Sequence, residues 1–218
     1  MSKPLYLMAL ISAAFALPVW ANTSQTLSAS SLFSNPTQTQ ESVEVINNIK
    51  LKSTLNINKH DLHFNGGAVR DKFFIDLYIA SLYTTESQTK AQQVLKTNKA
   101  NAIHIHILSK LISNTKMQSA LIDGLKQATN NKIKPFTAQI ETLVRAFDEP
   151  IKQGDEFLLL SEPGAGLRVY KNNMVKETIE GESFRKAILK IWLGEDPVQT
   201  SVKFAMLEGQ KNTASTLK

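Results

Sequence analysis

Residues 64–83 read FNGGAVRDKFFIDLYIASLY, and this stretch indicates the fold more clearly than any other part of the chain. Gly66 and Gly67 predict a tight bend, because glycine adopts backbone conformations that other residues avoid. A long strand is expected over Phe73–Tyr83, where apolar residues recur at every second position. The stretch therefore predicts a bend that leads into a half-buried strand of an antiparallel sheet.

Arg70 lies between the expected bend and the expected strand. A guanidinium group at the mouth of a half-apolar sheet surface suits an anionic or carbonyl-bearing organic ligand. The alternative is that Arg70 pairs with Asp71 or Asp76 and only completes the turn, as many surface arginines do. The residue types alone favour the second interpretation, in which Arg70 only completes the turn.

The first 21 residues have the pattern of a signal peptide. Lys3 supplies a positive charge, Leu5–Leu17 form an apolar segment, and Ala21 is a small residue that suits cleavage before Asn22. The apolar segment is too short for a membrane span of about 20 residues. We therefore expect an exported protein, periplasmic or otherwise secreted. The alternative is an uncleaved N-terminal anchor.

The bulk composition limits the classes of partner. Removal of residues 1–21 takes away one lysine and lowers the formal net charge from +6 to +5. Basic residues are scattered and form no dense run, so we expect no nucleic-acid partner, while weak contact with anionic lipid is compatible with this charge. The chain has no cysteine, which excludes disulfides, thiol catalysis and thiolate metal ligands.

The domain organisation follows from shifts in composition. Residues 22–42 are polar and show no apolar period, which predicts a flexible linker. The folded domain is expected at residues 43–208, and residues 209–218 form a C-terminal tail.

Within this domain, the apolar periods predict an α+β fold. Strands are expected at residues 43–49, 55–64, 73–83, 101–108, 156–161, 167–171 and 174–179. Helices are expected at residues 89–97, 117–128, 140–147, 184–192 and 202–207. Because most strands are joined as hairpins and each helix has one apolar side, we expect an antiparallel sheet with helices on one face.

Two pairs of histidines are candidates for metal ligands. His104 and His106 point to the same face of one expected strand, and His60 and His63 form a second pair. The sequence places no obvious acidic third ligand beside either pair. We therefore expect no metal site, and interpret the histidines as part of a polar sheet face.

Three segments together resemble one protein family. They are residues 65–83, which begin NGGAVR; residues 163–181, which begin PGAG; and residues 184–197, which contain IWLG. The chain is similar in these segments to the bacterial chalcone isomerase-like proteins, and the resemblance covers about residues 43–208. It implies an open-faced β-sandwich, in which helices cover a large antiparallel sheet and a ligand cleft lies between them.

The resemblance also implies roles for individual residues. The plant enzymes of the family close a chalcone without a cofactor, and an arginine after the glycine-rich segment stabilises the oxyanion. Arg70 occupies that place, and Tyr78 replaces a threonine on the long strand. These two residues are therefore the catalytic candidates. Ile191 replaces a polar cleft residue and Trp192 lies beside it, so both join Arg70 and Tyr78 as ligand-binding candidates. A tryptophan at this helix spacing is more often part of a core, and the resemblance shifts Trp192 toward the cleft wall.

Other polar positions of the enzymes are not kept. Where the enzymes have a tyrosine and an asparagine on the next helix, this chain reads Thr115-Lys116 and Ile122-Asp123. Some family members that lack the full set bind fatty acids and hold the carboxylate with an arginine. The resemblance therefore implies a small apolar or aromatic ligand bound without a cofactor.

Three functions follow from this sequence. The first is an exported protein that binds a small apolar acid, a fatty acid or a phenolic compound, in a cleft with Arg70. The second is a cofactor-free intramolecular lyase or isomerase that acts on an enone. The third is an interaction protein of the cell envelope that binds no ligand.

Overall fold

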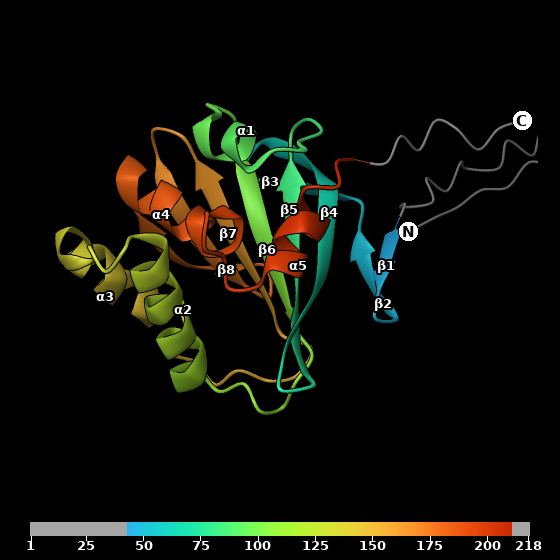
Figure 1. Cartoon of the computed structure of the whole chain (residues 1–218), viewed down its shortest axis with the longest axis horizontal. Helices are drawn as coiled ribbons and strands as arrows, with labels where there is room; N and C mark the ends of the chain where they lie inside the picture. The colour runs from blue at the N-terminus through green and yellow to red at the C-terminus, as the bar shows by residue number, and fades with distance from the viewer. Residues whose placement is uncertain (1–42, 211–218) are drawn as a thin grey trace, which may run out of the picture. The chain divides into compact units, whose positions relative to one another are not determined.

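Seven strands form one antiparallel sheet, and their order in the sheet follows their order in the chain. The structure is a computed structural model that describes residues 43–210; the expected signal peptide, the linker and the last residues of the tail lie outside this range. The strands, seen in Figure 1, are β3 (Thr54–Ile57), β4 (His60–Lys72), β5 (Ile75–Thr84), β6 (Asn101–Ile107), β7 (Glu156–Glu162), β8 (Gly166–Lys171) and β9 (Met174–Ile179).

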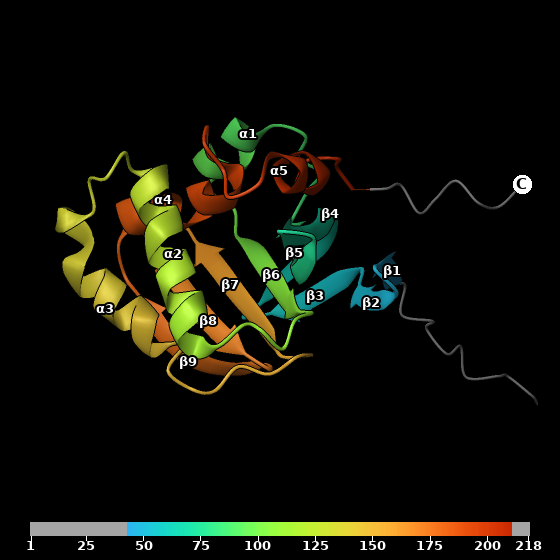
Figure 2. The same ribbon diagram turned by 60° about the horizontal axis from the view of Figure 1, so that its bottom comes forward.

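Helices cover one face of this sheet, as Figure 2 shows. This arrangement confirms the predicted α+β fold with an antiparallel sheet. Within residues 43–210, no helix is both long enough and apolar enough to cross a membrane. The helices are α1 (Ala91–Lys96), α2 (Asn114–Ala128), the short 3-10 helix η1 (Lys134–Phe136), α3 (Thr137–Arg145), α4 (Glu182–Leu193) and α5 (Thr200–Met206).

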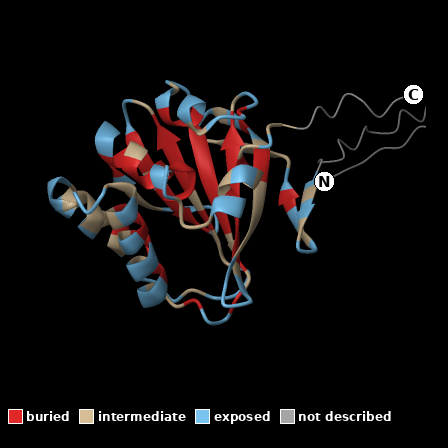
Figure 3. Cartoon of the chain, in the orientation of Figure 1, coloured by how far each residue is buried: buried red, intermediate tan, exposed pale blue. Residues whose placement is uncertain are grey.

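The main core lies between the sheet and the helices. Helix α4 is its centre, because Phe184, Ile188 and Trp192 are almost completely buried there. Alternate strand residues point to the other face of the sheet, where Tyr83 and Tyr170 belong to a second, smaller core. Figure 3 shows the buried residues concentrated in the sheet and in α4.

The expected strand at residues 43–49 is wrong in its extent. The structure has two strands there, β1 (Val43–Ile46) and β2 (Ile49–Lys52), which form a separate hairpin. The turn between them places Asn47 and Asn48 at positive φ, which asparagine tolerates better than most residues. The hydroxyl of Tyr83 donates a hydrogen bond of 2.7 Å to the carbonyl of Lys52 and joins the hairpin to the outer face of the sheet.

The bend predicted at Gly66 and Gly67 is also wrong. Both glycines lie inside β4, which pairs with β5 across a register shift next to Gly66. The chain turns instead at Phe73 and Phe74, so the expected strand begins at Ile75 and not at residue 73. The expected strand at residues 55–64 is likewise divided by a turn at residues 58 and 59.

Asn65 and Gly66 hold the sheet to α5. The Asn65 side chain is fully buried, and its Nδ2 donates to the carbonyls of Gln88 and Met206, each at 2.7 Å. A Cβ atom on Gly66 would lie 2.0 Å from the carbonyl oxygen of Ala205, so only glycine allows α5 to approach β4 this closely. The NGG motif therefore serves as a structural anchor.

An ion pair between a buried arginine and an exposed glutamate fixes the start of α4. Arg185 is fully buried, donates through Nη1 to Ser161 Oγ at 2.6 Å, and donates through Nε to Glu182 at 2.9 Å. The hydrogen bonds from Arg185 lower the pKa of Glu182 to about 2. Because the buried guanidinium has its carboxylate partner, this pair ties α4 to β7.

Candidate functional site

Arg70 and Tyr78 face each other across the β4–β5 pair. They are register partners, and the Cζ atom of Arg70 lies 5.6 Å from the centroid of the Tyr78 ring. This distance places the guanidinium group within the range of a cation–π contact. The Nε atom of Arg70 is buried and has no hydrogen-bond partner among residues 43–210. A buried donor without a partner is unusual and is often explained by a ligand.

The neighbouring acids do not neutralise this arginine. Asp71 accepts a hydrogen bond of 2.8 Å from Gln199, and Asp76 accepts one of 3.3 Å from Asn47. Within the described part of the chain, no carboxylate lies within 4.0 Å of the Arg70 guanidinium nitrogens. The predicted alternative, in which Arg70 pairs with Asp71 or Asp76, is therefore not what the structure contains.

Tyr78 connects Arg70 with α4. The Nε1 atom of Trp192 donates a hydrogen bond of 3.4 Å to the Tyr78 hydroxyl, and both side chains are less than a tenth exposed. Burial raises the pKa of Tyr78, although the charge of Arg70 and the hydrogen bond from Trp192 oppose this shift. The phenol therefore keeps its proton at neutral pH, and the hydroxyl can donate this proton to an acceptor.

Ile191 lies elsewhere in the core. A Cβ atom on Gly124 of α2 would come within 2.8 Å of the Cγ2 atom of Ile191, so Ile191 packs into the α2–α4 contact. Trp192 occupies the next position of α4 and points to Tyr78. The structure thus brings Arg70, Tyr78 and Trp192 together and places Ile191 against a neighbouring helix.

Helix α2 presents an apolar side to the core. Its buried side chains include Met117, Leu121 and Leu125, whereas Thr115 and Lys116 are exposed. Asp123 is also exposed. The two places on this helix where the enzymes have a tyrosine and an asparagine therefore carry no buried polar residue in this chain. The chemistry of the site therefore rests on two donors, the Arg70 guanidinium and the Tyr78 hydroxyl. Two such donors can hold a carboxylate or another oxyanion.

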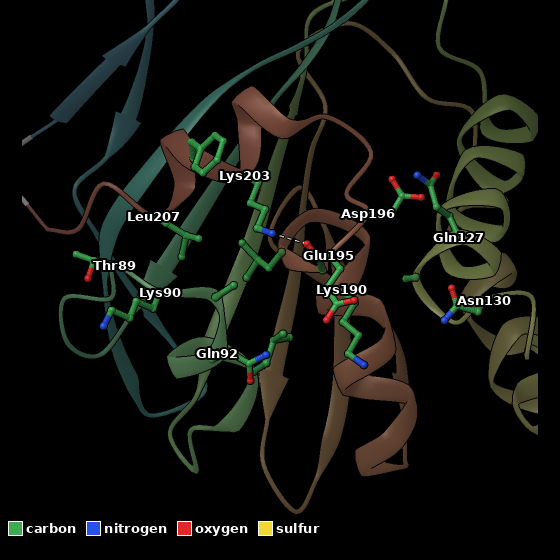
Figure 4. Close-up of a pocket in the computed structure, with 16 residues that line it drawn as sticks. Thr89, Lys90, Gln92, Gln127, Asn130, Lys190, Glu195, Asp196, Lys203 and Leu207 are labelled. Atoms are coloured by element: carbon green, nitrogen blue, oxygen red, sulfur yellow. Dashed lines mark hydrogen bonds between the residues drawn. The ribbon is translucent and has the colours of Figure 1, made fainter.

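Two cavities occur at other places in the described residues. One of about 600 Å³ lies between α1, α4, α5 and the end of α2, and Figure 4 shows its lining. Lys203 at its edge donates to the carbonyl of Gly194 at 2.6 Å, the dashed line in that figure. The other, of about 460 Å³, lies between the β1–β2 hairpin and the outer sheet face. None of the predicted site residues lines either cavity.

Three of the four histidines contact carboxylates, and His63 contacts the Thr54 hydroxyl. Glu156 lies 3.6 Å from His104 Nε2 and 3.3 Å from His106 Nδ1, and these two contacts lower the pKa of Glu156 to about 2. His60 Nε2 lies 3.0 Å from Glu162. Among residues 43–210, no three side chains of His, Asp or Glu come together in a way that could hold a metal ion.

Sequence reasoning misassigned two parts of the β4–β5 hairpin. It interpreted Asn65 and Gly66 as part of a bend, because the segments that they contact lie far away in the chain. It placed Phe73 and Phe74 inside a strand, because the apolar run continues through them into Ile75. The length of this stretch, about 20 residues against about five or six in a usual strand, was the signal that a hairpin turn lies between two strands there.

Comparisons with known proteins agree with this fold. A profile of the family described as chalcone isomerase-like matches residues 43–208. The crystal structure of a fatty-acid binding protein from Arabidopsis thaliana superimposes with a TM-score of 0.59 at 14% sequence identity. The match covers 77% of this chain and 96% of that one. No curated protein matches the sequence. The open-faced arrangement that the resemblance implied is thereby confirmed.

Proposed function

The chain belongs to the chalcone isomerase-like family, and on that premise we propose that it binds a small apolar carboxylic acid through Arg70. The observation that carries the proposal is the Arg70 Nε atom, which is buried beside the Tyr78 phenol without a partner among the described residues. A carboxylate accepts hydrogen bonds from both groups and neutralises the guanidinium charge. The name of the Arabidopsis protein supports a fatty acid as the ligand class.

The apolar part of the ligand lies toward the main core. Tyr78 and Trp192 are in contact and nearly buried, so side chains around them must shift to admit an acyl chain or an aromatic ring. Binding of this kind selects an opened state of the core. The surrounding residues of β5, β6 and α4 are apolar, and such surroundings strengthen the attraction between Arg70 and the carboxylate.

This proposal gives the protein a binding function rather than a catalytic one. An isomerase of this kind needs a base that takes up the proton of the attacking phenol, whereas the raised pKa of Tyr78 keeps that residue protonated and unable to act as the base. The buried side of α2 adds only apolar side chains. We therefore expect no turnover of a chalcone-type enone above the rate in buffer. Export, which residues 1–21 suggest, belongs to the same proposal.

Titration with a long-chain fatty acid tests the proposal. Arg70→Gln removes the charge but keeps a polar side chain, and we expect the affinity to fall by about 10-fold to 100-fold. Tyr78→Phe removes one hydrogen bond and should lower the affinity by about 5-fold. Arg168→Gln is the matched control, because Arg168 on β8 also has a buried Nε without a partner among the described residues. Equal affinity of the Arg70 variant and the wild type would overturn the proposal.

A further inference from the structure

The turn between β4 and β5 exposes two aromatic side chains. Phe73 is 82% exposed and Phe74 is fully exposed, and Ile75 beside them is 40% exposed. We call residues 73 and 74 the aromatic tip. Figure 3 shows this end of the hairpin in the colour of exposed residues, at the lower end of the sheet. Apolar side chains gathered at one projecting point indicate a contact surface.

The backbone of the aromatic tip is strained as well. Phe73 and Phe74 have φ values of 51° and 62°, in the left-handed region that bulky side chains avoid. The described part of the chain has four other pairs of adjacent non-glycine residues with positive φ, and each begins with asparagine: 47–48, 58–59, 130–131 and 172–173. Phenylalanine at the tip therefore costs stability through both strain and exposure, which points to a function.

One cationic side chain accompanies the aromatic tip. The Nζ atom of Lys72 lies 5.5 Å from the centroid of the Phe73 ring. The backbone N–H groups of Leu108 and Ser109 donate to the carbonyl of Leu77, at 3.0 and 3.1 Å, so the loop that continues to Lys110 leaves β6 at the same end of the sheet. Leu111, the next residue of that loop, is apolar and 55% exposed.

The acids at this end are held by neighbouring amides. Asp71 bonds to Gln199, and Asp76 bonds to Asn47. Lys72 is exposed and in contact with the tip, so a positive charge stands beside the apolar apex. Two exposed phenyl rings with one exposed lysine beside them suit the acyl chains and the anionic head groups of a lipid bilayer.

We propose that the aromatic tip inserts into the surface of an anionic lipid bilayer. A stable protein interface needs about 800 Å² on each partner. Two phenylalanine side chains supply only about 150–250 Å² each, and a bilayer needs no matching pocket to bury them. One part of this inference rests on the proposed function: the exchange of an apolar acid between the membrane and the site at Arg70. Arg70 lies three residues from the tip, about 10 Å along the strand, and is therefore close to the membrane surface when the tip is inserted.

Replacement of the tip by asparagines tests the insertion. The double variant Phe73→Asn, Phe74→Asn introduces the Asn-Asn pair that forms the turn at positions 172 and 173. Because asparagine adopts the same positive φ values there, the turn should be kept. We expect binding of the full chain to vesicles of phosphatidylcholine and phosphatidylglycerol to fall by at least about 10-fold. Lys72→Gln should lower the same binding by about 5-fold. Equal binding of the double variant and the wild type would overturn the proposal.

A fluorescent probe tests the position of the tip directly. The chain has no cysteine, so Phe74→Cys accepts a polarity-sensitive fluorophore at one place only. With vesicles we expect its emission to shift to the blue and to be quenched by brominated lipid. Lys59→Cys is the matched control, because it lies in a turn of the same kind at the opposite end of β4. Its emission should not change, and an equal shift at both positions would contradict insertion by the tip.

Two further measurements separate insertion of the tip from fatty-acid binding and from dimer formation. The double asparagine variant should bind a soluble fatty acid as tightly as the wild type. If the wild type binds no fatty acid but its tip inserts, only the proposed function fails. Sedimentation without lipid tests whether the tip binds a second copy of the chain instead of a bilayer. That alternative would hold if the wild type forms a dimer, the double variant does not, and neither protein binds vesicles.

Discussion

The middle of β4 and its C-terminal end treat their polar and apolar groups in opposite ways. In the middle of the strand Asn65 is fully buried, and its side chain bonds to two other segments. Toward the C-terminal end the Nε atom of Arg70 has no partner among the described residues, and Phe73 and Phe74 in the following turn are exposed in a left-handed conformation. One strand therefore has a middle part that holds the fold together and an end that is costly to the fold.

This difference separates the residues that stabilise the fold from those for which we propose a function. Satisfied buried polar groups stabilise a fold, whereas unpaired donors and strained residues persist when something else requires them. The anchor at Asn65 and Gly66 keeps β4 in place beneath α5. The fixed strand then holds Arg70 and the aromatic tip at the places where we propose that a ligand and a lipid surface bind. The following predictions test whether the two parts of β4 differ in this way.

Gly66→Ala should cause the largest loss of stability. The new Cβ atom would lie 2.0 Å from the carbonyl oxygen of Ala205, and helix α5 would have to move. We expect the free energy of unfolding to fall by about 4 kcal/mol in urea denaturation. Gly164→Ala is the control, because Gly164 also has a positive φ but a Cβ atom added there would meet no atom within 4 Å. It should cost about 1 kcal/mol, and equal losses would refute the close-contact argument.

Asn65→Ala should cause the next largest loss. It leaves the Gln88 N–H group and the Met206 carbonyl without their hydrogen bonds, and we expect a loss of about 3 kcal/mol. Asn101 is equally buried, but its side-chain amide has no partner among residues 43–210. Asn101→Ala should therefore change the free energy of unfolding by less than about 1 kcal/mol. Thermal and urea denaturation of both variants would reveal whether the anchor differs from an ordinary buried asparagine.

The asparagine variant of the aromatic tip should gain stability. Phe73→Asn with Phe74→Asn relieves the left-handed strain, and we expect the free energy of unfolding to rise by about 1 kcal/mol. The reverse exchange, Asn172→Phe with Asn173→Phe, places the same strain in a second hairpin and should cost a similar amount. A loss of stability in the asparagine variant would mean that the tip supports the fold.

Acid should weaken the ion pair at the start of α4. The pKa of Glu182 is lowered to about 2 in the folded chain by Arg185, so its contribution to stability is complete above the ordinary value of 4.5. This contribution is lost as the pH falls from about 5 toward 2. Glu182→Gln should lower stability at neutral pH and flatten the dependence over this range. An unchanged acid profile in the variant would show that the pair is not coupled to folding.

The sequence predicted the elements whose pattern is local. The helix at α4 and the strands β5 to β9 were found because their apolar periods are regular over one element. The turn at Asn47 was missed although it has the same Asn-Asn pair as the turn at residues 172 and 173, and the turn at Phe73 was missed because phenylalanine rarely adopts a positive φ. The anchor could not be found locally, since the need for glycine at position 66 comes from Ala205, far along the chain.

The candidate site was predicted in part. Arg70 and Tyr78 were named from the family resemblance, and the structure places them on paired strands. The hydrogen bond from Trp192 to Tyr78 depends on how α4 lies over the sheet, which no spacing in the sequence reveals. The packing of Ile191 against Gly124 depends in the same way on the contact between two helices.

The ionisation of a bound acid tests the central claim most directly. A fatty acid with an isotope-labelled carboxyl carbon can be followed by NMR while the pH is lowered, in the wild type and in Arg70→Gln. If Arg70 holds the carboxylate, the pKa of the bound acid lies below its ordinary value in the wild type and rises in the variant. The same pKa in both proteins would contradict the assignment of Arg70 as the carboxylate-binding residue.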